Sequence, residues 1–400
     1  MKKYVIYLLK KNIPFFAVMF AILLSSFLIN ASNIRNYHAY YIDGGQYRFM
    51  AGPNSGLATF VIPLVIVLIV AAFLANRYRY SIKSVDLFYQ TGKGERAVRY
   101  ANNLTLLTGT LVTYTVAFLL AIVFMIIKQA IMNGQESEID NVKYIYMMFN
   151  FGYYFSAYFL ALIVGTVNYF ITYFLVTRSN TMKNSVITFV FGQTLLSVIF
   201  MTPIWYYDTV CLLTGNQIDF YTTGLYGTRC LSFIGPISYI IGRFEEPIVF
   251  GTFTDLKVFT PASTFNNDAS YVLTIVCLSL YFVIGGLCIY RFVKEKESSG
   301  EIAGKPVGRD KLQMIIFHSV FGLGALWGGA VGGSLSSIGL LTIFSSITSV
   351  IMFAAFYYLM LGIVKKSFKL TKKDLVVYIP IVSFQLISSI VLMSLSLMCR

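Results

Sequence analysis

Few side chains in this sequence are placed to do chemistry. The two histidines, His38 and His318, lie far apart in the chain, so neither a histidine-based metal site nor a Ser/His/Asp arrangement is predicted. We expect His318 to be a simple hydrogen-bonded or interfacial histidine rather than a proton relay. Cys211 and Cys230 fall in one long loop, where they could form a disulfide in an oxidising space or remain thiols.

A phosphate-binding loop is also not predicted. In the nearest match, Gly300 to Pro306, there is one residue too few between the glycines. Pro306 stands where Ser or Thr would bind magnesium. The segment follows an apolar run rather than a soluble strand, so we interpret it as a flexible turn. We therefore expect no enzymatic activity, catalytic residue, bound cofactor or metal site in this chain.

Long apolar runs dominate the sequence. Hydrophobic residues make up 57% of the 400 residues and charged residues only 12%, a composition that no water-soluble domain could bury. We predict an all-α polytopic integral membrane protein with about nine transmembrane helices, in a range of about eight to ten. The predicted spans are residues 14–30, 57–76, 104–127, 149–177, 185–204, 271–291, 313–331, 336–362 and 376–397.

The distribution of charge predicts the orientation. With the amino terminus inside, the cytoplasmic segments hold 23 of the 31 Lys and Arg residues but only 7 of the 17 Asp and Glu residues. Cytoplasmic loops concentrate Lys and Arg, so this orientation is favoured, and an odd number of spans places the carboxyl terminus outside. The net charge of +14 and the pI near 9.4 come from these short loops, so no nucleic-acid partner is predicted.

The chain is expected to have four segments. Residues 1–13 are predicted to form an amphipathic cytoplasmic helix along the inner leaflet, although a plain positive flank for the first span is the alternative. Residues 14–291 form a six-span core with a long outer segment at 205–270, where 230–242 is too short to cross and fits a re-entrant or interfacial hairpin. The remaining segments are a cytoplasmic linker at 292–312 and additional spans at 313–400.

The loop after the second span, residues 77–103, is basic and has internal structure. Ser84 can cap a short helix through Leu87, Phe88 and Tyr89 before the break at residues 91–94. An amphipathic element held against the cytoplasmic face suits docking to another protein. A solvated basic loop that only sets the topology is the alternative interpretation.

Small and polar residues in the spans indicate how helices pack. Gly324, Gly328 and Gly332 stand on one helical face, a spacing that allows close helix contact within the chain or with a second subunit. Asn103 and Asn168 are expected to make interhelical hydrogen bonds. Because the span interiors hold almost no ionisable residues, an ion-coupled carrier is disfavoured.

Two motifs resemble the permease subunits of type-two ABC exporters. Ser84 to Tyr89 is similar to their Asp-Leu-Tyr-rich coupling element, although residues 90–96 replace the Leu-Pro turn that usually follows. Arg291 to Gly300 resembles a basic stretch that is followed by Glu-x-Ala-Gly, with Ser299 in place of the usual Ala. That pattern belongs to a Firmicutes branch linked to peptide-antibiotic and cell-envelope stress responses. The additional C-terminal spans also suit this branch.

The resemblance implies a multi-pass transport subunit of a bacterial plasma membrane. Its partners would be a dimer of ABC ATPase subunits that binds ATP and Mg, a second permease of the same or a different chain, and membrane lipids. Its cargo would be hydrophobic or amphipathic, such as an antimicrobial peptide, a drug or a lipid-like molecule. The implied ATPase-coupling residues are Asp86, Leu87, Phe88, Tyr89, Lys93 and Arg96, with Arg178 and Lys183 in a second coupling loop.

A membrane sensor or resistance module is the alternative function. It would bind an antibiotic or a partner protein at the outer loop without net transport. The two functions share the predicted fold and orientation. They differ in whether an ATPase binds at the cytoplasmic face.

Overall fold

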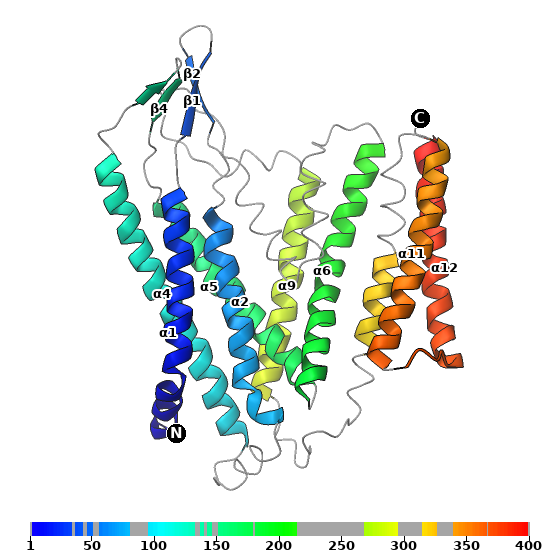
Figure 1. Cartoon of the computed structure of the whole chain (residues 1–400), viewed down its shortest axis with the longest axis horizontal. Coiled ribbons are helices and arrows are strands. Elements are labelled where there is room, and N and C mark those ends of the chain that lie inside the picture. Colours follow the sequence, from blue (N-terminus) through cyan, green and yellow to red (C-terminus); the bar gives the residue numbers. More distant parts are fainter. Residues whose placement is uncertain are drawn as a thin grey trace. The chain divides into compact units, whose positions relative to one another are not determined.

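Helices form where the sequence is continuously apolar, because a bilayer interior offers no hydrogen-bond partners to the backbone. The computed structural model has a helix in each of the nine predicted ranges (Figure 1). These are α1 Lys2–Asn33, α2 Gly56–Ala75, α4 Glu95–Met132, α5 Phe151–Val176, α6 Met182–Leu213, α9 Asp268–Lys294, the helix Met314–Ala325, α11 Gly339–Lys365 and α12 Lys372–Met398. The structure describes residues 2–33, 37–42, 46–50, 56–80, 95–132, 137–139, 142–145, 151–178, 181–213, 268–294, 314–325, 339–365 and 367–398.

Within that described part of the chain, six helices are long and apolar enough to cross a membrane. The helical membrane class is therefore confirmed. Nine crossings, and the side on which each terminus lies, stay predictions. The six apolar stretches are Lys3–Ile29, Arg96–Lys128, Tyr158–Val176, Met182–Ile199, Ile347–Lys365 and Lys372–Val391, and two shorter ones are Val61–Ala75 and Met314–Ala325.

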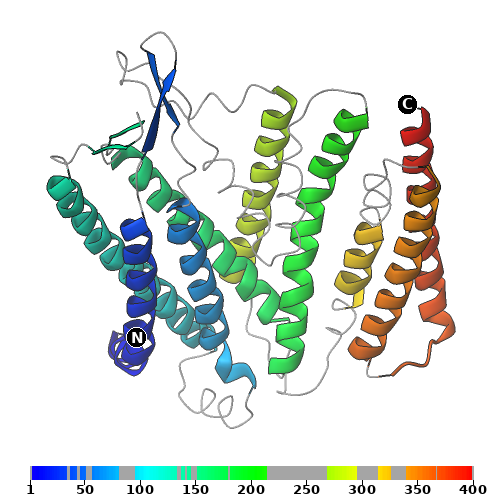
Figure 2. The same cartoon turned by 45° about the horizontal axis from the view of Figure 1, so that its top comes forward.

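The first of two compact units contains Met1–Val186 and Ile237–Pro306. In it, α1 packs against α4 and α2, α2 packs against α4 and α5, and α5 packs against α9, as Figures 1 and 2 both show. The ring of Phe27 in α1 meets that of Tyr114 in α4 edge-on, with centroids 5.6 Å apart. Leu64 of α2 is fully buried. The helices of this unit therefore share one core.

A small antiparallel sheet, which the sequence analysis did not predict, joins two loops of this unit. It has the strand order β2-β1-β4-β3. The pairing of β1 with β4, with Tyr37 opposite Ile145, connects the segment between α1 and α2 to the segment between α4 and α5. The strands are β1 Tyr37–Ile42, β2 Gln46–Met50, β3 Ser137–Ile139 and β4 Val142–Ile145.

The basic amino terminus is part of α1 rather than a separate helix. The helix continues through Pro14, whose ring removes one backbone hydrogen bond and favours a kink. Figure 1 shows the first turns bending away from the axis of the rest. Ile6, Tyr7 and Ile13 are exposed in these turns, whereas Leu8 is buried. This distribution suits the predicted interfacial position, which stays a prediction.

The second unit contains Ile187–Pro236 and Val307–Arg400. Here α11 and α12 form an antiparallel pair. The Tyr378 hydroxyl donates to the Ala354 carbonyl at 2.8 Å, and the ring of Tyr378 stacks on that of Tyr357 with centroids 5.0 Å apart. The helix Met314–Ala325 contributes Phe321, whose ring stacks on that of Tyr357 with centroids 4.4 Å apart. Aromatic contacts thus hold these three helices together.

Glycines allow close helix contact mainly in the first unit. A Cβ added at Gly165 of α5 would lie 2.8 Å from Leu68 Cδ1 of α2, and one at Gly285 of α9 would collide with Val167 of α5. At Gly324 an added Cβ would meet only Phe353, at 4.0 Å. Gly328 and Gly332 lie outside the described residues, so a packing role for the predicted three-glycine face stays a prediction.

We expect Gly285→Ala to destabilise the protein by about 1–3 kcal/mol, the usual cost of overpacking. The new methyl group would collide with Val167, a stiff β-branched side chain. Gly286→Ala is the matched control, because nothing lies within 4 Å of its added Cβ. Thermal unfolding of both variants in detergent measures the difference. Equal midpoints would show that α5 and α9 do not need this close contact.

Candidate functional site

The candidate site lies at the start of α4, directly after the predicted coupling residues. Asp86, Leu87, Phe88, Tyr89 and Lys93 themselves fall outside the described residues. Arg96, the last of that set, is exposed in the first turn of α4. The site is therefore built from the helix ends that hold the two sides of this loop.

The start of α4, which follows the loop 81–94, is hydrogen-bonded to the end of α9. One carbonyl oxygen, that of Val293, accepts a hydrogen bond from Arg96 Nη2 at 3.1 Å and another from the Tyr100 hydroxyl at 2.9 Å. Val293 lies in the last turn of α9, where carbonyls lack partners within the helix. A positive charge is also favourable there, because the helix dipole is negative at this end. The start of α4 and the end of α9 therefore form one polar joint.

Aromatic packing supports this joint from the apolar side. The ring of Tyr100 meets that of Phe292 of α9 edge-on, with centroids 4.8 Å apart. Phe292 is buried and also contacts Phe170 and Tyr173 of α5. Arg99, only 1% exposed, places its guanidinium carbon 5.7 Å from the centre of the Tyr100 ring. The joint thus continues into the core between α4, α5 and α9.

One turn further along α4, two asparagines connect it to three other helices. The Oδ1 atom of Asn103 accepts hydrogen bonds from the Tyr169 hydroxyl of α5 at 3.0 Å and from Asn76 Nδ2, just after α2, at 3.4 Å. Asn102 Oδ1 accepts from the Tyr4 hydroxyl of α1 at 3.3 Å. The interhelical bonding predicted for Asn103 is confirmed. Four helices therefore meet in one polar cluster.

The entry of the loop is fixed to the end of α5. The Val176 carbonyl, at the last residue of α5, accepts from the Tyr80 hydroxyl at 3.5 Å and from Ser185 Oγ of α6 at 3.0 Å. Tyr80 ends the short 3-10 helix Arg77–Tyr80. The described residues on the two sides of 81–94 are thus bonded to different helices, Tyr80 to the end of α5 and Arg96 to the end of α9.

The two residues of the predicted second coupling loop, Arg178 and Lys183, lie between Val176 and Ser185 in the chain. The guanidinium carbon of Arg178 lies 4.2 Å from the centre of the Phe174 ring. Lys183 is exposed in the first turn of α6. The Val176 carbonyl accepts hydrogen bonds from Ser185, at the far side of this second loop, and from Tyr80, which directly precedes the first loop. The second loop therefore begins beside the residue that precedes the first. Other exposed basic residues at these helix ends are Arg77, Arg291 and Lys294.

Sequence reasoning did not identify Tyr4, Tyr80, Tyr100 or Tyr169 as part of this site. The chain has 29 tyrosines, so the residue type by itself carries little information. A tyrosine near the end of a span is commonly placed with its ring in the apolar region and its hydroxyl at a polar partner. The signal in the sequence that could have identified these tyrosines was therefore the position of each one relative to the end of a span.

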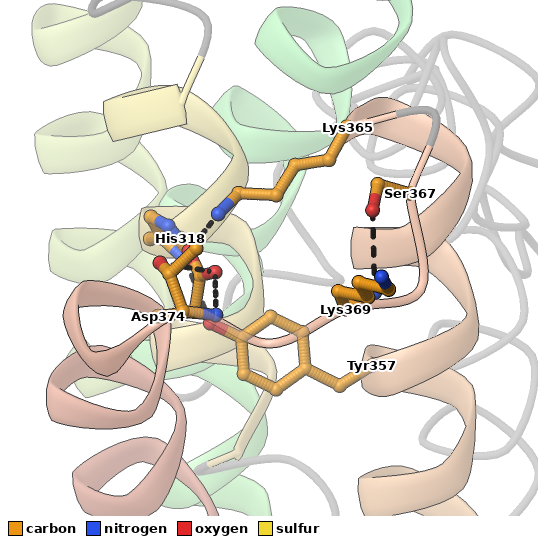
Figure 3. Close-up of polar contacts among 7 residues, drawn as sticks. His318, Tyr357, Lys365, Ser367, Lys369 and Asp374 are labelled. Atoms are coloured by element: carbon orange, nitrogen blue, oxygen red, sulfur yellow. Dashed lines mark hydrogen bonds and ion pairs between the residues drawn. The ribbon is translucent and has the colours of Figure 1, made fainter.

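Polar side chains also meet in the second unit. His318 Nδ1 and the Tyr357 hydroxyl are hydrogen-bonded at 2.6 Å (Figure 3), which confirms the simple hydrogen-bonding role predicted for His318. Cys211 lies in α6, which extends to Leu213 and so into the predicted outer segment. Cys230 lies outside the described residues, as does 230–242, and the disulfide and the hairpin stay predictions.

Comparison with known proteins does not assign this arrangement. No family model, curated protein or solved structure matches the chain. Across the described residues, no group of three or more His, Cys, Asp or Glu side chains is placed to hold a metal ion. The site is therefore an arrangement of hydrogen-bonded helix ends that can hold and orient a loop.

We expect Asn103→Ala to destabilise the protein by about 1–3 kcal/mol, the cost of leaving buried polar partners unsatisfied. Tyr169 would keep only the Asn103 backbone carbonyl, at 3.1 Å, and Asn76 Nδ2 would lose its interhelical acceptor. Thr108→Val is the control, because that exposed hydroxyl donates only within its own helix. Thermal unfolding in detergent tests this. A midpoint unchanged in both variants would mean that the cluster does not hold the helices together.

Proposed function

We propose that this chain is the membrane-spanning permease subunit of an ATP-binding-cassette exporter. It lies in the bacterial plasma membrane with its amino terminus in the cytoplasm. Its cargo is a hydrophobic or amphipathic molecule such as an antimicrobial peptide, a drug or a lipid-like compound. A separate ATPase dimer binds ATP and Mg and supplies the energy, and a second permease completes the transport path.

One observation carries this proposal: the residues that flank the segment 81–94 are bonded to the ends of different helices. Tyr80 is bonded to the end of α5 and Arg96 to the end of α9. A loop that only set the topology would need no such anchors. A loop that passes force from a partner to the spans needs them, because its displacement must move helices rather than be absorbed locally.

The cluster around Asn103 extends this connection. It joins α4 to α1, α2 and α5 through hydrogen bonds of 3.0 to 3.4 Å. A push on the start of α4 is therefore shared among several spans. The exposed Arg77, Arg96 and Lys183 make this end basic, which suits an acidic surface on the ATPase.

The first test is co-purification of the tagged protein in mild detergent. We expect a stoichiometric ABC ATPase to accompany it. A combined Phe88→Ala, Lys93→Glu and Arg96→Glu variant should bind that ATPase at least about tenfold more weakly, since like charges at an interface cost several kcal/mol. Arg48→Glu in β2 is the control for charge reversal elsewhere in the chain.

Full ATPase binding by the triple variant would remove the loop from the coupling role. A protein that purifies alone, and binds no ATPase after reconstitution, would contradict the exporter proposal itself. In that case a sensor or resistance function would account for the sequence better.

The anchor can be tested separately from the docking surface. Tyr100→Phe removes one of the two donors to the Val293 carbonyl and leaves Arg96 in place. We expect ATPase binding to be retained, while cargo-stimulated ATP hydrolysis falls roughly two- to thirtyfold, the range for changes that weaken coupling between sites. Tyr290→Phe, at an exposed tyrosine one turn earlier in α9, is the control. Unchanged stimulation in Tyr100→Phe would exclude this joint from the coupling path.

A further inference from the structure

Hydrogen bonds hold the described residues of the turn between α11 and α12, 367–371; Lys366 lies outside them. The Ser367 amide donates to the Gly362 carbonyl at 3.0 Å and closes the end of α11. Thr371 directly precedes α12, and its amide and its hydroxyl both donate to Asp374 Oδ2 at 2.7 Å; the bond from the amide is one of the two that make a capping box. The Tyr358 hydroxyl donates to the Phe368 carbonyl at 2.9 Å. Each helix end thus makes at least one hydrogen bond within the turn.

Asp374, the acidic residue of this turn, bonds to other residues of the turn. Asp374 forms an ion pair with Lys365 across the turn, as Figure 3 shows, and is only 5% exposed. Its charge is therefore balanced by Lys365 and by its hydrogen bonds to Thr371. The carboxylate is not available to neutralise the other basic residues of the turn.

The outward side of the turn combines lysines with apolar side chains. Phe368 is 58% exposed and Leu370 36% exposed. The Phe368 ring lies against Gly362, where a Cβ would collide with it, and its centroid is 6.2 Å from that of the Tyr358 ring. These contacts hold the ring in place although more than half of the side chain is exposed. The exposed lysines beside these two residues are Lys369, Lys372 and Lys373.

The position of the turn identifies its surroundings. The apolar stretch of α11 ends at Lys365 and that of α12 begins at Lys372. Residues between two adjacent spans lie at the depth of the lipid headgroups, whichever side of the membrane they face. Apolar side chains flanked by lysines bind such a surface by insertion and by attraction to negative charge.

We propose that this turn, Lys365 to Asp374, is a binding element for anionic phospholipids. Phe368 and Leu370 enter the boundary between headgroups and acyl chains. Lys369, Lys372 and Lys373 contact the phosphate groups of phosphatidylglycerol-like lipids, which therefore gather at this end of α11 and α12. This role is independent of any ATPase and of the cargo.

The test uses a tryptophan placed in the turn of the full-length protein. The natural tryptophans, Trp205 and Trp327, are replaced by Phe, and Phe368→Trp supplies the reporter; Leu370→Trp provides a second reporter. The protein is reconstituted in phosphatidylcholine bilayers that contain phosphatidylglycerol. Bromine on the acyl chains of one lipid class at a time then quenches the emission of a neighbouring tryptophan.

We expect brominated phosphatidylglycerol to quench at roughly one-tenth of the mole fraction that brominated phosphatidylcholine needs, or less, since each lysine near an anionic surface contributes about fivefold in binding. Replacing Lys369, Lys372 and Lys373 by Gln should abolish this preference. Replacing Lys3, Lys10 and Lys11 of α1 by Gln removes the same charge elsewhere and should leave it unchanged. Raising the salt from about 0.1 M to about 1 M should also abolish it, since the screening length falls from about 10 Å to about 3 Å.

Equal quenching by the two lipids, with either reporter, would overturn the proposal. Absence of quenching by both lipids would overturn it as well, because the turn would then lie away from the bilayer. Loss of ATPase co-purification in the Lys369, Lys372 and Lys373 variant, with no lipid preference in the parent protein, would instead assign the turn to an acidic protein partner.

Discussion

The carbonyl groups at helix ends are the constraint on which this structure depends. A helix leaves its last carbonyls without partners inside the helix, so donors from neighbouring elements can bond to them. Here the Val176 and Val293 carbonyls each accept two side-chain donors from other elements. Satisfying them ties the end of α5 to Tyr80 and Ser185, and the end of α9 to the start of α4.

Hydrogen bonding at the start of α4 also explains how a largely apolar unit keeps one arrangement. Packing of Leu and Val against one another specifies little in lipid, since lipid chains are equally apolar. A carboxamide such as that of Asn103 accepts bonds only from particular directions, and its partners are Tyr169 of α5 and Asn76, the residue after α2. These polar groups thus favour one register of α4 against α5 and the end of α2.

The sequence predicted the helical class, a helix in each of the nine span ranges and the bonding of Asn103 and His318, because apolar length and isolated polar residues are local signals. It did not predict the sheet, since the pairing of Tyr37 with Ile145 joins segments far apart in the chain. It also missed Tyr100 and Val293, because a backbone carbonyl has no residue type to recognise. The packing role of Gly324, Gly328 and Gly332 stays a prediction, because the spacing of glycines does not specify which neighbour they contact. The coupling residues from Asp86 to Lys93 lie outside the described part of the chain.

The pairing of β1 with β4 also orders the events of biosynthesis. β1 and β2 leave the ribosome early, directly after α1, and can form only their own hairpin. At about 5–20 residues per second, residue 145 follows Met50 by roughly 5 to 20 s. During that interval α2 and α4 are synthesised, and the pairing of β1 with β4 must wait for both. The pairing therefore closes a segment of the chain that already contains two complete helices.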